Sequence, residues 1–420
     1  MTGRCPSGAD RVVIVGAGHA GVQLAHSLRE NQHHGPVVLL GDESELPYHR
    51  PPLSKSMLDT SAPAEPTLLR AEASYAARDI TVLRQARAAR VDRGRRLVEL
   101  DEGDPVPYDH LVLATGSRAR NLSVPGAELP GVVQVRTLSD AMALRSLLSR
   151  GSQRVVVVGG GYIGLEIAAA VSSTGHQVVI VEGTERLLAR SVAAEVSHHV
   201  LRSHTERGCR VELGSAVTAF VGDTHGVQSV ELTTGERIPA DLVVVGVGGV
   251  PNAELAAASG LEICPITGGI VVDERLGTDD PRVSAIGDCA TFPSQFAGGP
   301  IRLESVQNAV DQARHVAARL TDGPDTAYNN VPWFWTDQGA LKIQSTGISL
   351  REETRVVVGS PPTGRFSVLR FEGDRLVAVD SVNRPADHLA ARRVLAGPRR
   401  PSPESARAPG FDLKRFLSSV

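Results

Sequence analysis

The sequence is poor in cysteine and has no long apolar run, and each shortage excludes a class of protein. Its 420 residues include only four cysteines, with no C-x-x-C or C-x4-C pair. A dithiol active site, a zinc knuckle and a disulfide scaffold are therefore not expected. No run approaches about 18 apolar residues, and the N-terminus has no apolar signal segment, so we expect neither a membrane span nor a signal peptide. These absences predict a soluble, cytoplasmic protein.

The chain also lacks a basic excess and contains very little lysine. Its 44 Lys and Arg residues against 47 Asp and Glu give a net charge of −3, which argues against a nucleic-acid partner. At roughly 150 residues per domain, the length fits two or three globular domains. Lys55, Lys342 and Lys414 are the only lysines. A lysine kept in such an arginine-rich chain suggests a site that needs a compact ammonium.

Two segments of the chain share the pattern of a dinucleotide-binding fold. The first runs from the β-branched strand 11–15 through Gly16-Ala-Gly-His-Ala-Gly21 into a helix, and then into the strand 37–40. A G-x-G-x-x-G turn at this place lets a pyrophosphate approach the backbone, where free N–H groups and the helix dipole bind its charge. Asp42 and Glu43 follow the second strand, and Asp42 is the better candidate to bind the ribose hydroxyls.

The second copy begins with the strand 154–158 and continues through Gly159-Gly-Gly-Tyr-Ile-Gly164 and a helix into the strand 178–181. Glu182 ends that strand. A carboxylate there accepts hydrogen bonds from the 2′-OH of the ribose but repels a 2′-phosphate, which favours NADH over NADPH. Arg186 lies four residues later, where it could soften this repulsion.

An acidic residue further along the chain distinguishes the two folds. The segments 241–246 and 283–288 are again apolar strands that end in glycine turns, and the second finishes in Gly287-Asp288. An acid at this point suits a ribityl hydroxyl, so we expect FAD in the first fold and NAD in the second. An ordinary strand-end turn is the alternative explanation of the Gly-Asp pair.

The chain changes character after about Ala327. Both tryptophans lie in Pro332-Trp-Phe-Trp335, and the alternating segments 366–371 and 376–379 predict an antiparallel sheet. The segment 397–410 is rich in Pro, Ser and Arg, which predicts a flexible linker to a short terminal helix.

Five motifs together resemble the FAD-dependent, NADH-linked ferredoxin reductases of bacterial oxygenase systems, of the putidaredoxin reductase and biphenyl dioxygenase reductase type. The resemblance runs from Arg11 to about Asp387. It implies an α/β fold with two Rossmann-like, glutathione-reductase-like nucleotide-binding domains and a C-terminal α+β interface domain. The implied bounds are 1–115 with 250–325 for FAD, 116–249 for NAD, and 326–420 for the interface domain and a flexible tail. The motifs are Arg50-Pro-Pro-Leu-Ser-Lys55, Ala114-Thr-Gly116, Gly159-Gly-Gly-Tyr-Ile-Gly-Leu-Glu166, Gly287-Asp288 and Pro332-Trp-Phe-Trp335.

The resemblance also implies which residues bind each cofactor. Lys55 is expected beside the isoalloxazine ring, Val306 at the start of a helix that faces the flavin, and Trp335 near the flavin face. His19 stands where the family often has Leu, and the segment 338–342 looks shortened. The other implied FAD residues are Gly16, Gly18, His19, Ala20, Asp42, Arg50, Ala88, Ala114, Thr115, Gly116, Arg136, Gly287 and Asp288, and the NAD residues are Gly161, Ile163, Gly164, Glu166 and Glu182.

Lys55 and Glu166 are the two residues to which we assign a catalytic role. A positive charge near the flavin favours its reduced, anionic form, and Lys55 would supply that charge while Glu166 pairs with it and sets its orientation. Because no side chain need act as a general base, the role is electrostatic tuning. No metal site is expected, since the histidines of the segment 197–204 fit a solvated helix better than metal ligands.

The implied activity is that of an NADH:ferredoxin oxidoreductase that serves a cytochrome P450 or a ring-hydroxylating dioxygenase. Two alternatives are an NADH-responsive interaction module of the apoptosis-inducing-factor type, and another NADH-dependent flavin reductase without a dithiol. For an acidic ferredoxin, an arginine cluster is one docking candidate, and Arg314 and Lys342 are rivals. The cluster comprises Arg84, Arg87, Arg90, Arg93, Arg95 and Arg96, and a solvated face is the explanation that we favour for it over docking.

Overall fold

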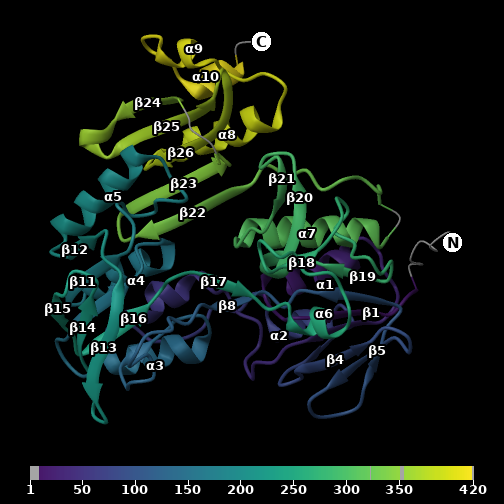
Figure 1. Cartoon of the computed structure of the whole chain (residues 1–420). Coiled ribbons are helices and arrows are strands. Elements are labelled where there is room, and N and C mark those ends of the chain that lie inside the picture. The colour runs from purple at the N-terminus through teal and green to yellow at the C-terminus, as the bar shows by residue number, and fades with distance from the viewer. Residues whose placement is uncertain (1–8, 322, 351–353, 419–420) are drawn as a thin grey trace. The chain divides into compact units, whose positions relative to one another are not determined.

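The computed structural model describes residues 9–321, 323–350 and 354–418 (Figure 1). The chain forms two compact units, each assembled from separate stretches of sequence. Unit 1 contains Met1–His49, Thr67–Arg118 and Val250–Pro332, and unit 2 contains Arg50–Pro66, Ala119–Gly249 and Trp333–Val420. The segment with Lys55 therefore belongs to unit 2, although the sequence on both sides of it belongs to unit 1.

Unit 1 is built on a five-stranded parallel sheet in the order β19-β7-β1-β2-β3. Its strands are runs of β-branched and aliphatic residues, as a parallel sheet covered on both faces requires. β1 lies between β2 and β7, so the connections leave it in opposite directions and create a switch point at its carboxyl end. The strands are β1 (Val12–Val15), β2 (Val37–Leu40), β3 (Ile80–Leu83), β7 (His110–Leu113) and β19 (Val283–Ala285).

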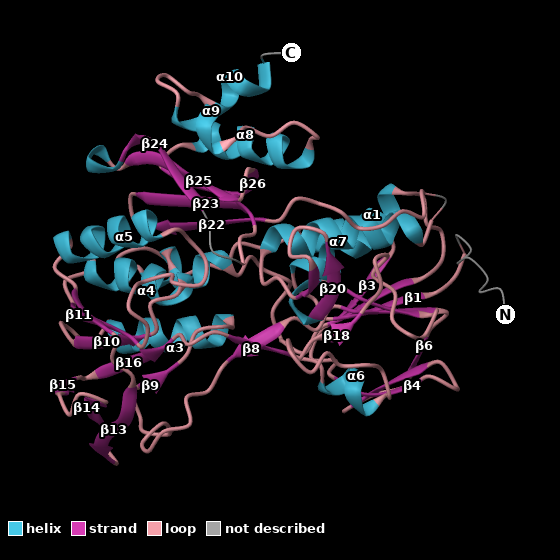
Figure 2. Ribbon diagram, turned by 45° about the horizontal axis from the view of Figure 1, so that its top comes forward, coloured by secondary structure: helices cyan, strands magenta, loops and turns pink. Residues whose placement is uncertain are grey.

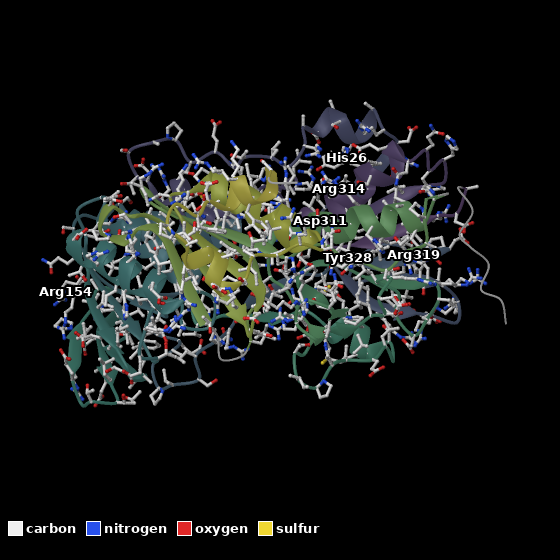
Figure 3. The ribbon with its side chains drawn as sticks, turned by 90° about the horizontal axis from the view of Figure 1, so that it is seen from above. His26, Arg154, Asp311, Arg314, Arg319 and Tyr328 are labelled. Carbon is white, nitrogen blue, oxygen red and sulfur yellow. The ribbon has the colours of Figure 1, made fainter. Side chains whose placement is uncertain are left out.

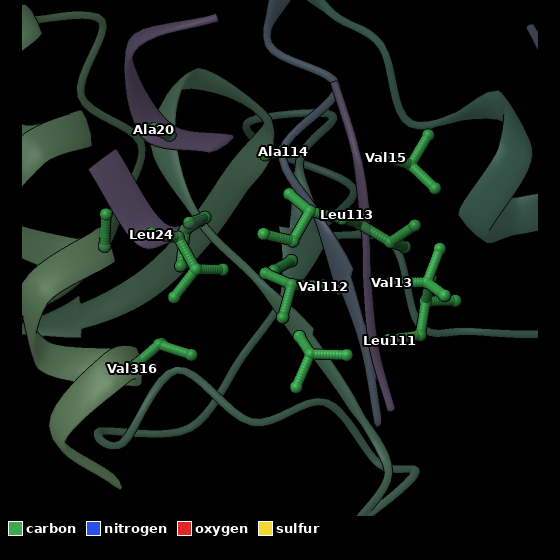
Figure 4. Close-up of a cluster of buried hydrophobic side chains, with 14 of the residues drawn as sticks. Val13, Val15, Ala20, Leu24, Leu111, Val112, Leu113, Ala114 and Val316 are labelled. Carbon is green, nitrogen blue, oxygen red and sulfur yellow. The ribbon is translucent and has the colours of Figure 1, made fainter. Parts of the chain in front are cut away.

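Two long helices, α1 (His19–Glu30) and α7 (Val306–Arg319), pack against each other in unit 1 (Figure 2). Leu24 of α1 and Val316 of α7 are fully buried, together with Val112 of β7 (Figure 4). This shared core fixes the start of α1 relative to the end of β1. The smaller elements of the unit are α2 (Glu72–Ala76), β4 (Ala88–Asp92), β5 (Leu97–Leu100), β6 (Val106–Pro107), α6 (Glu254–Ala258), β18 (Ile270–Val271), a 3-10 turn (Gly287–Cys289), β20 (Ala290–Ser294) and β21 (Gly299–Ile301).

Unit 2 contains a second five-stranded parallel sheet, in the order β12-β11-β10-β16-β9. Here β10 lies between β11 and β16, which repeats the position of β1 in unit 1. The strands are β9 (Val132–Val133), β10 (Arg154–Val158), β11 (Gln177–Glu182), β12 (Arg210–Leu213) and β16 (Leu242–Val245). The other elements are α3 (Leu138–Leu148), α4 (Tyr162–Ser172), α5 (Ala194–Glu206), an antiparallel sheet of β13 (Val217–Asp223), β14 (Gly226–Leu232) and β15 (Arg237–Pro239), and two 3-10 turns (Pro51–Ser54 and Ser56–Leu58).

The C-terminal part of unit 2 is a five-stranded antiparallel sheet in the order β22-β23-β26-β25-β24. The sequence prediction of an antiparallel sheet here is confirmed. The strands are β22 (Trp333–Gln338), β23 (Leu341–Gly347), β24 (Thr354–Ser360), β25 (Arg365–Glu372) and β26 (Arg375–Val382), followed by the helices α8 (Pro385–Ala396), α9 (Pro403–Arg407) and α10 (Leu413–Ser418), with a 3-10 turn (Pro361–Thr363) after β24. Two of the places where the chain passes from one unit to the other lie in the paired strands β8 (Ser117–Ala119) and β17 (Gly249–Pro251).

The segment predicted as a flexible linker, 397–410, is instead packed and partly helical. Ser402 caps α9 by accepting a hydrogen bond from the backbone of Ser405, and Pro403 occupies the first helical position. Pro403 and Ala406 are buried, and Arg400 donates hydrogen bonds to two backbone carbonyl oxygens. The composition was misleading because Ser followed by Pro is also a helix-start signal. The terminal helix itself is confirmed as α10.

Candidate functional site

The first glycine-rich turn leaves the N-terminus of α1 open. Gly18 is the N-cap of α1, and no described side chain caps the helix. A Cβ added to Gly18 would have nothing within 4 Å, whereas one added to Gly21 would lie 2.0 Å from the carbonyl oxygen of Gly16. One glycine therefore permits tight packing and the other leaves space in front of the helix. Free N–H groups facing that space fit the pyrophosphate of FAD.

The residues around this turn come from the ends of neighbouring strands. Ala114 follows β7 and donates a backbone hydrogen bond to Val15, at the end of β1. Thr115 donates its hydroxyl to the backbone oxygen of Asn252 over 2.6 Å, and Gly116 accepts from the Asn252 backbone. Asp42 follows β2 and is exposed. An exposed carboxylate at this end of the sheet fits the predicted contact with the adenosine ribose.

Asp288 lies in a 3-10 turn after β19, and its carboxylate accepts a hydrogen bond from another residue of unit 1. Ser117 donates its hydroxyl to the Asp288 carboxylate over 2.9 Å. The backbone N–H of Gly287 donates to the side-chain oxygen of Gln312 on α7 over 2.7 Å. Val306 begins α7, whose N-cap Ser305 accepts from the backbone N–H of Asn308. Gln312 therefore connects the Gly-Asp turn to the helix that the sequence predicted to face the flavin.

His19, the residue that departs from the family pattern, is the first residue of α1. Its ring packs edge-on against that of His49, with centroids 5.3 Å apart. Burial and the charge of Arg70 lower the pKa of His49, which favours its neutral form. Ala20, the next residue after His19, is buried. Ala88, also predicted to bind FAD, is half-buried at the start of β4.

The second glycine-rich turn repeats the first in its backbone. Gly161 is the N-cap of α4, without a capping side chain among the described residues, and its added Cβ would again meet nothing within 4 Å. A Cβ on Gly164 would lie 2.1 Å from the Gly159 carbonyl oxygen. Ile163 is 45% exposed at this turn. The arrangement fits a second pyrophosphate, as the sequence predicted for NAD.

Glu182 accepts three hydrogen bonds, one from the second turn and two from Thr184. One carboxylate oxygen accepts from the backbone N–H of Gly160 over 2.7 Å, and the other accepts from the backbone and hydroxyl of Thr184 over 2.8 Å each. Arg186 uses its guanidinium elsewhere, donating to Ser197 and to the carbonyl oxygens of Ala189 and Val192. Its charge is therefore anchored to neighbouring groups of the chain.

Lys55 and Glu166 form the ion pair that the sequence prediction required. The Lys55 ammonium lies 2.6 Å from one carboxylate oxygen of Glu166, with side-chain exposures of 24% and 4%, and it also donates to the carbonyl oxygen of Pro51 over 3.1 Å. Ser54 donates to the same carboxylate oxygen as Lys55, over 2.5 Å. Thr336 donates to the other oxygen over 2.6 Å.

Sequence reasoning missed both of these hydroxyl donors. Thr336 is 170 positions from Glu166, and a threonine in a strand gives no sign of a distant carboxylate. Ser54 was the more accessible signal because it directly precedes Lys55. The same segment is held by Arg50, which donates to the carbonyl oxygen of Arg136 over 2.7 Å.

The Trp-Phe-Trp segment forms the first half of β22. Phe334 packs on Tyr162 at the start of α4, with centroids 4.3 Å apart. Trp333 contacts His388 and lies under the guanidinium of Arg392, 4.6 Å from its centroid. Trp335 is half-buried, and its approach to the flavin stays a prediction.

The histidines of α5 need one correction. His198 is exposed, but His204 is fully buried, so the helix is not solvated along its whole length. The ring of His204 bonds to Gln338, the last residue of β22, over 2.9 Å, and burial lowers its pKa. Within the described residues no cluster of three or more His, Cys, Asp or Glu could hold a metal ion.

The arginine cluster makes several ion pairs within the chain. Arg87 pairs with Asp101, Arg90 with Glu99, and Arg93 with Asp279 and Asp280. The two rival candidates are exposed: Arg314 lies on α7 (Figure 3) and Lys342 on β23. No described helix is long and apolar enough to cross a bilayer.

Two helix N-termini, each open in front of a glycine turn at a switch point, define the class of protein: an α/β oxidoreductase that binds two nucleotides. Family comparisons agree with this class. Residues 10–313 match the model described as pyridine nucleotide-disulphide oxidoreductase, and residues 333–417 match the one described as reductase C-terminal.

Individual relatives narrow the class further. Rhodocoxin reductase of Rhodococcus erythropolis is 45% identical over 407 residues, covering 97% of this chain and 94% of that protein. The ferredoxin reductase of the CYP199A2 system from Rhodopseudomonas palustris has a TM-score of 0.93 at 43% identity, covering 97% and 99% of the two chains. Putidaredoxin reductase, in its covalent complex with putidaredoxin, has a TM-score of 0.92 at 39% identity, covering 97% and 98%.

The chain belongs to the family of FAD-dependent, NADH-linked ferredoxin reductases. The comparisons confirm the predicted family, the fold class, the oxidoreductase class and the use of FAD and NAD(H).

Proposed function

We propose that this protein oxidises NADH and passes the electrons singly to an iron–sulfur ferredoxin, which serves a cytochrome P450 or a ring-hydroxylating dioxygenase. The observation that supports this most is the pair of open glycine turns, one in each unit. Bound FAD supplies the chemistry by accepting two electrons as a hydride and releasing them one at a time. The chain supplies binding, orientation and charge.

The two nucleotides are assigned to different parts of the chain. We place FAD on residues 1–115 and 250–325, around the turn of α1, Asp42 and Asp288. We place NADH on residues 116–249, with Glu182 at the ribose. The remaining residues, 326–420, form the interface domain. A 2′-phosphate would meet the Glu182 carboxylate, and the guanidinium of Arg186 is already bonded to other groups, so NADH is the expected substrate.

The thiols support transfer to a separate acceptor. Cys209, Cys264 and Cys289 are each buried and form no disulfide, and the sequence contains no C-x-x-C or C-x4-C pair. A disulfide reductase of this fold needs such a pair next to the flavin. The lack of such a spacing in the sequence supports electron transfer to another protein or to a small acceptor.

Turnover with and without ferredoxin tests the proposal. The purified, FAD-loaded protein is given NADH and cytochrome c, first alone and then with a [2Fe–2S] ferredoxin. Reduction of cytochrome c should become rapid only when the ferredoxin is present, and NADPH should be a poor substitute. Negligible turnover with every acceptor would favour the NADH-responsive interaction module, and rapid ferredoxin-independent turnover would favour a general flavin reductase. The cytoplasmic location stays a prediction, which cell fractionation checks.

A further inference from the structure

The carboxylate of Glu166 is held at both oxygens inside unit 2. One oxygen accepts from Lys55 and Ser54, which belong to the same short segment of chain. The other accepts from Thr336 of β22 over 2.6 Å. Glu166 is 4% exposed and Thr336 is 1% exposed. Water therefore has little access to replace the threonine hydroxyl.

We propose that Thr336 is a positioning residue for the reductase: its hydroxyl fixes the rotation of the Glu166 carboxylate and thereby the place of the Lys55 ammonium. A carboxylate bonded at one oxygen can still turn about its terminal torsion, which has a broad, two-fold profile. Donors at both oxygens remove that freedom. The inference rests on the proposed electrostatic role of Lys55.

The backbone around Thr336 is suited to this task. Thr336 pairs with Ile343 of β23, which is itself buried, in a regular antiparallel register. Phe334, two residues earlier, packs on Tyr162 at the start of α4, and α4 is the helix that contains Glu166. Donor and acceptor are thus attached to elements that already contact each other. A β-branched side chain, which has restricted χ1 freedom, presents its hydroxyl with little loss of entropy.

Thr336 also joins the ion pair to a third stretch of sequence. Lys55 comes from the Arg50–Pro66 segment, Glu166 from α4, and Thr336 from the C-terminal sheet. Removing the hydroxyl would leave one oxygen of a nearly buried carboxylate without its donor, which is costly in a site of low dielectric. The carboxylate would then turn toward other donors and release Lys55 from its present position.

The first test measures Lys55 directly, by its reactivity toward an acylating reagent in the purified, FAD-loaded protein. Because the chain has three lysines, peptide mass spectrometry can follow each one, with the exposed Lys342 and Lys414 as internal references. An ammonium held in an ion pair is slow to react. Thr336→Val should increase the acylation rate of Lys55 about fivefold and leave the two reference lysines unchanged. Thr336→Ser, which restores the hydroxyl, should return Lys55 to the slow rate.

Thr346→Val is the matched control. Thr346 is buried in β23 of the same sheet, and its hydroxyl bonds to His388 over 2.9 Å, so its loss removes a buried hydroxyl of the same kind without touching Glu166. Acylation of Lys55 should stay slow in this variant. An equal increase in both valine variants, at unchanged thermal unfolding, would overturn the positioning role.

Stopped-flow reduction of the bound FAD by NADH separates this inference from the function on which it rests. Thr336→Val should slow reduction about fivefold at saturating NADH, with the KM for NADH little changed, and Thr336→Ser should restore the rate. If Lys55→Met slows reduction but Thr336→Val alters neither reduction nor acylation, the inference is wrong and the proposed function stands. If Lys55→Met has no effect on reduction, the electrostatic role of Lys55 itself is wrong.

Discussion

The two glycine turns of this reductase have the same backbone and different surroundings. Both follow a central parallel strand, both open an uncapped helix, and both contain two glycines packed against carbonyl oxygens. In the unit of the first turn, Ser117 donates to the carboxylate of Asp288, and Gln312 of α7 accepts from the backbone N–H of Gly287. The second turn donates a backbone hydrogen bond to Glu182 at the end of β11, and it leads into α4, where Glu166 pairs with Lys55. We therefore expect the backbone to supply two equivalent pyrophosphate sites, and the nearby side chains to decide which nucleotide each one binds.

The largest expected effect comes from adding a methyl group to one closely packed glycine of each turn. Gly21→Ala and Gly164→Ala each place a Cβ within 2.1 Å of a backbone oxygen. Each should destabilise its own fold by about 3 kcal/mol or more, because backbone cannot move aside as a side chain can. Chemical denaturation of the flavin-free protein measures this loss.

The matched controls are Gly18→Ala and Gly161→Ala, whose new methyl groups meet nothing within 4 Å. They should leave unfolding nearly unchanged, while Gly18→Ala weakens FAD binding and Gly161→Ala weakens NADH binding. If Gly18→Ala weakened NADH binding instead, the assignment of the two nucleotides would be reversed.

Lys55→Met tests the ion pair with Glu166, which is present after the second turn. It removes the ammonium but keeps much of the side-chain volume, and we expect flavin reduction by NADH to slow roughly tenfold to a hundredfold. Stopped-flow absorbance measures the rate, and circular dichroism checks that the fold is intact. FAD affinity should change far less than the rate, because the pyrophosphate turn is untouched.

Glu182→Ala should change coenzyme choice by about tenfold, measured as the ratio of kcat/KM for NADPH to that for NADH. The cause is the loss of a carboxylate that would repel a 2′-phosphate. Asp42→Ala is the comparison in the first fold, where it should weaken FAD binding without altering this ratio. An unchanged ratio in Glu182→Ala would mean that Glu182 does not approach the ribose.

The smallest expected effect concerns an aspartate at the amino-terminal end of each central strand, away from the glycine turn. The carboxylate of Asp109 accepts from the backbone N–H of Arg11, and that of Asp241 accepts from the backbone N–H of Arg154, each over 2.9 Å. Hydrogen bonds from the Arg154 side chain lower the pKa of Asp241. Asp241 therefore stabilises the fold above its unfolded pKa of about 4, and this contribution is lost as the pH falls through the lowered pKa of the folded state.

Asp241→Asn should accordingly lower stability at pH 7 by less than about 1 kcal/mol, because both partners are substantially exposed (47% and 41%). The free energy of unfolding, followed from pH 7 to acid, measures the difference from the parent protein. The two curves should converge at low pH. A constant gap would show that the charge of Asp241 is not the source of its contribution.

Local pattern was enough to predict the parts of this protein that depend on neighbouring residues. The valine-rich strands, the two glycine turns and the acids that follow them are encoded within about thirty residues each, since strand periodicity and turn chemistry are short-range. The same reasoning failed at 397–410, where composition suggested a linker and packing against the C-terminal sheet produced α9. It also failed at His204, which helix periodicity alone did not place in the core.

The sequence by itself was thus enough to predict two nucleotide-binding folds, their glycine turns, and Lys55 and Glu166 as candidates. Each of these depends on residue type at short spacing. Tertiary structure alone decided that the hydroxyl of Thr336 bonds to Glu166 and that Lys55 belongs to the unit of the second fold. Those contacts join stretches of chain up to 170 positions apart, and residue type at short spacing carries no information about partners at such a distance.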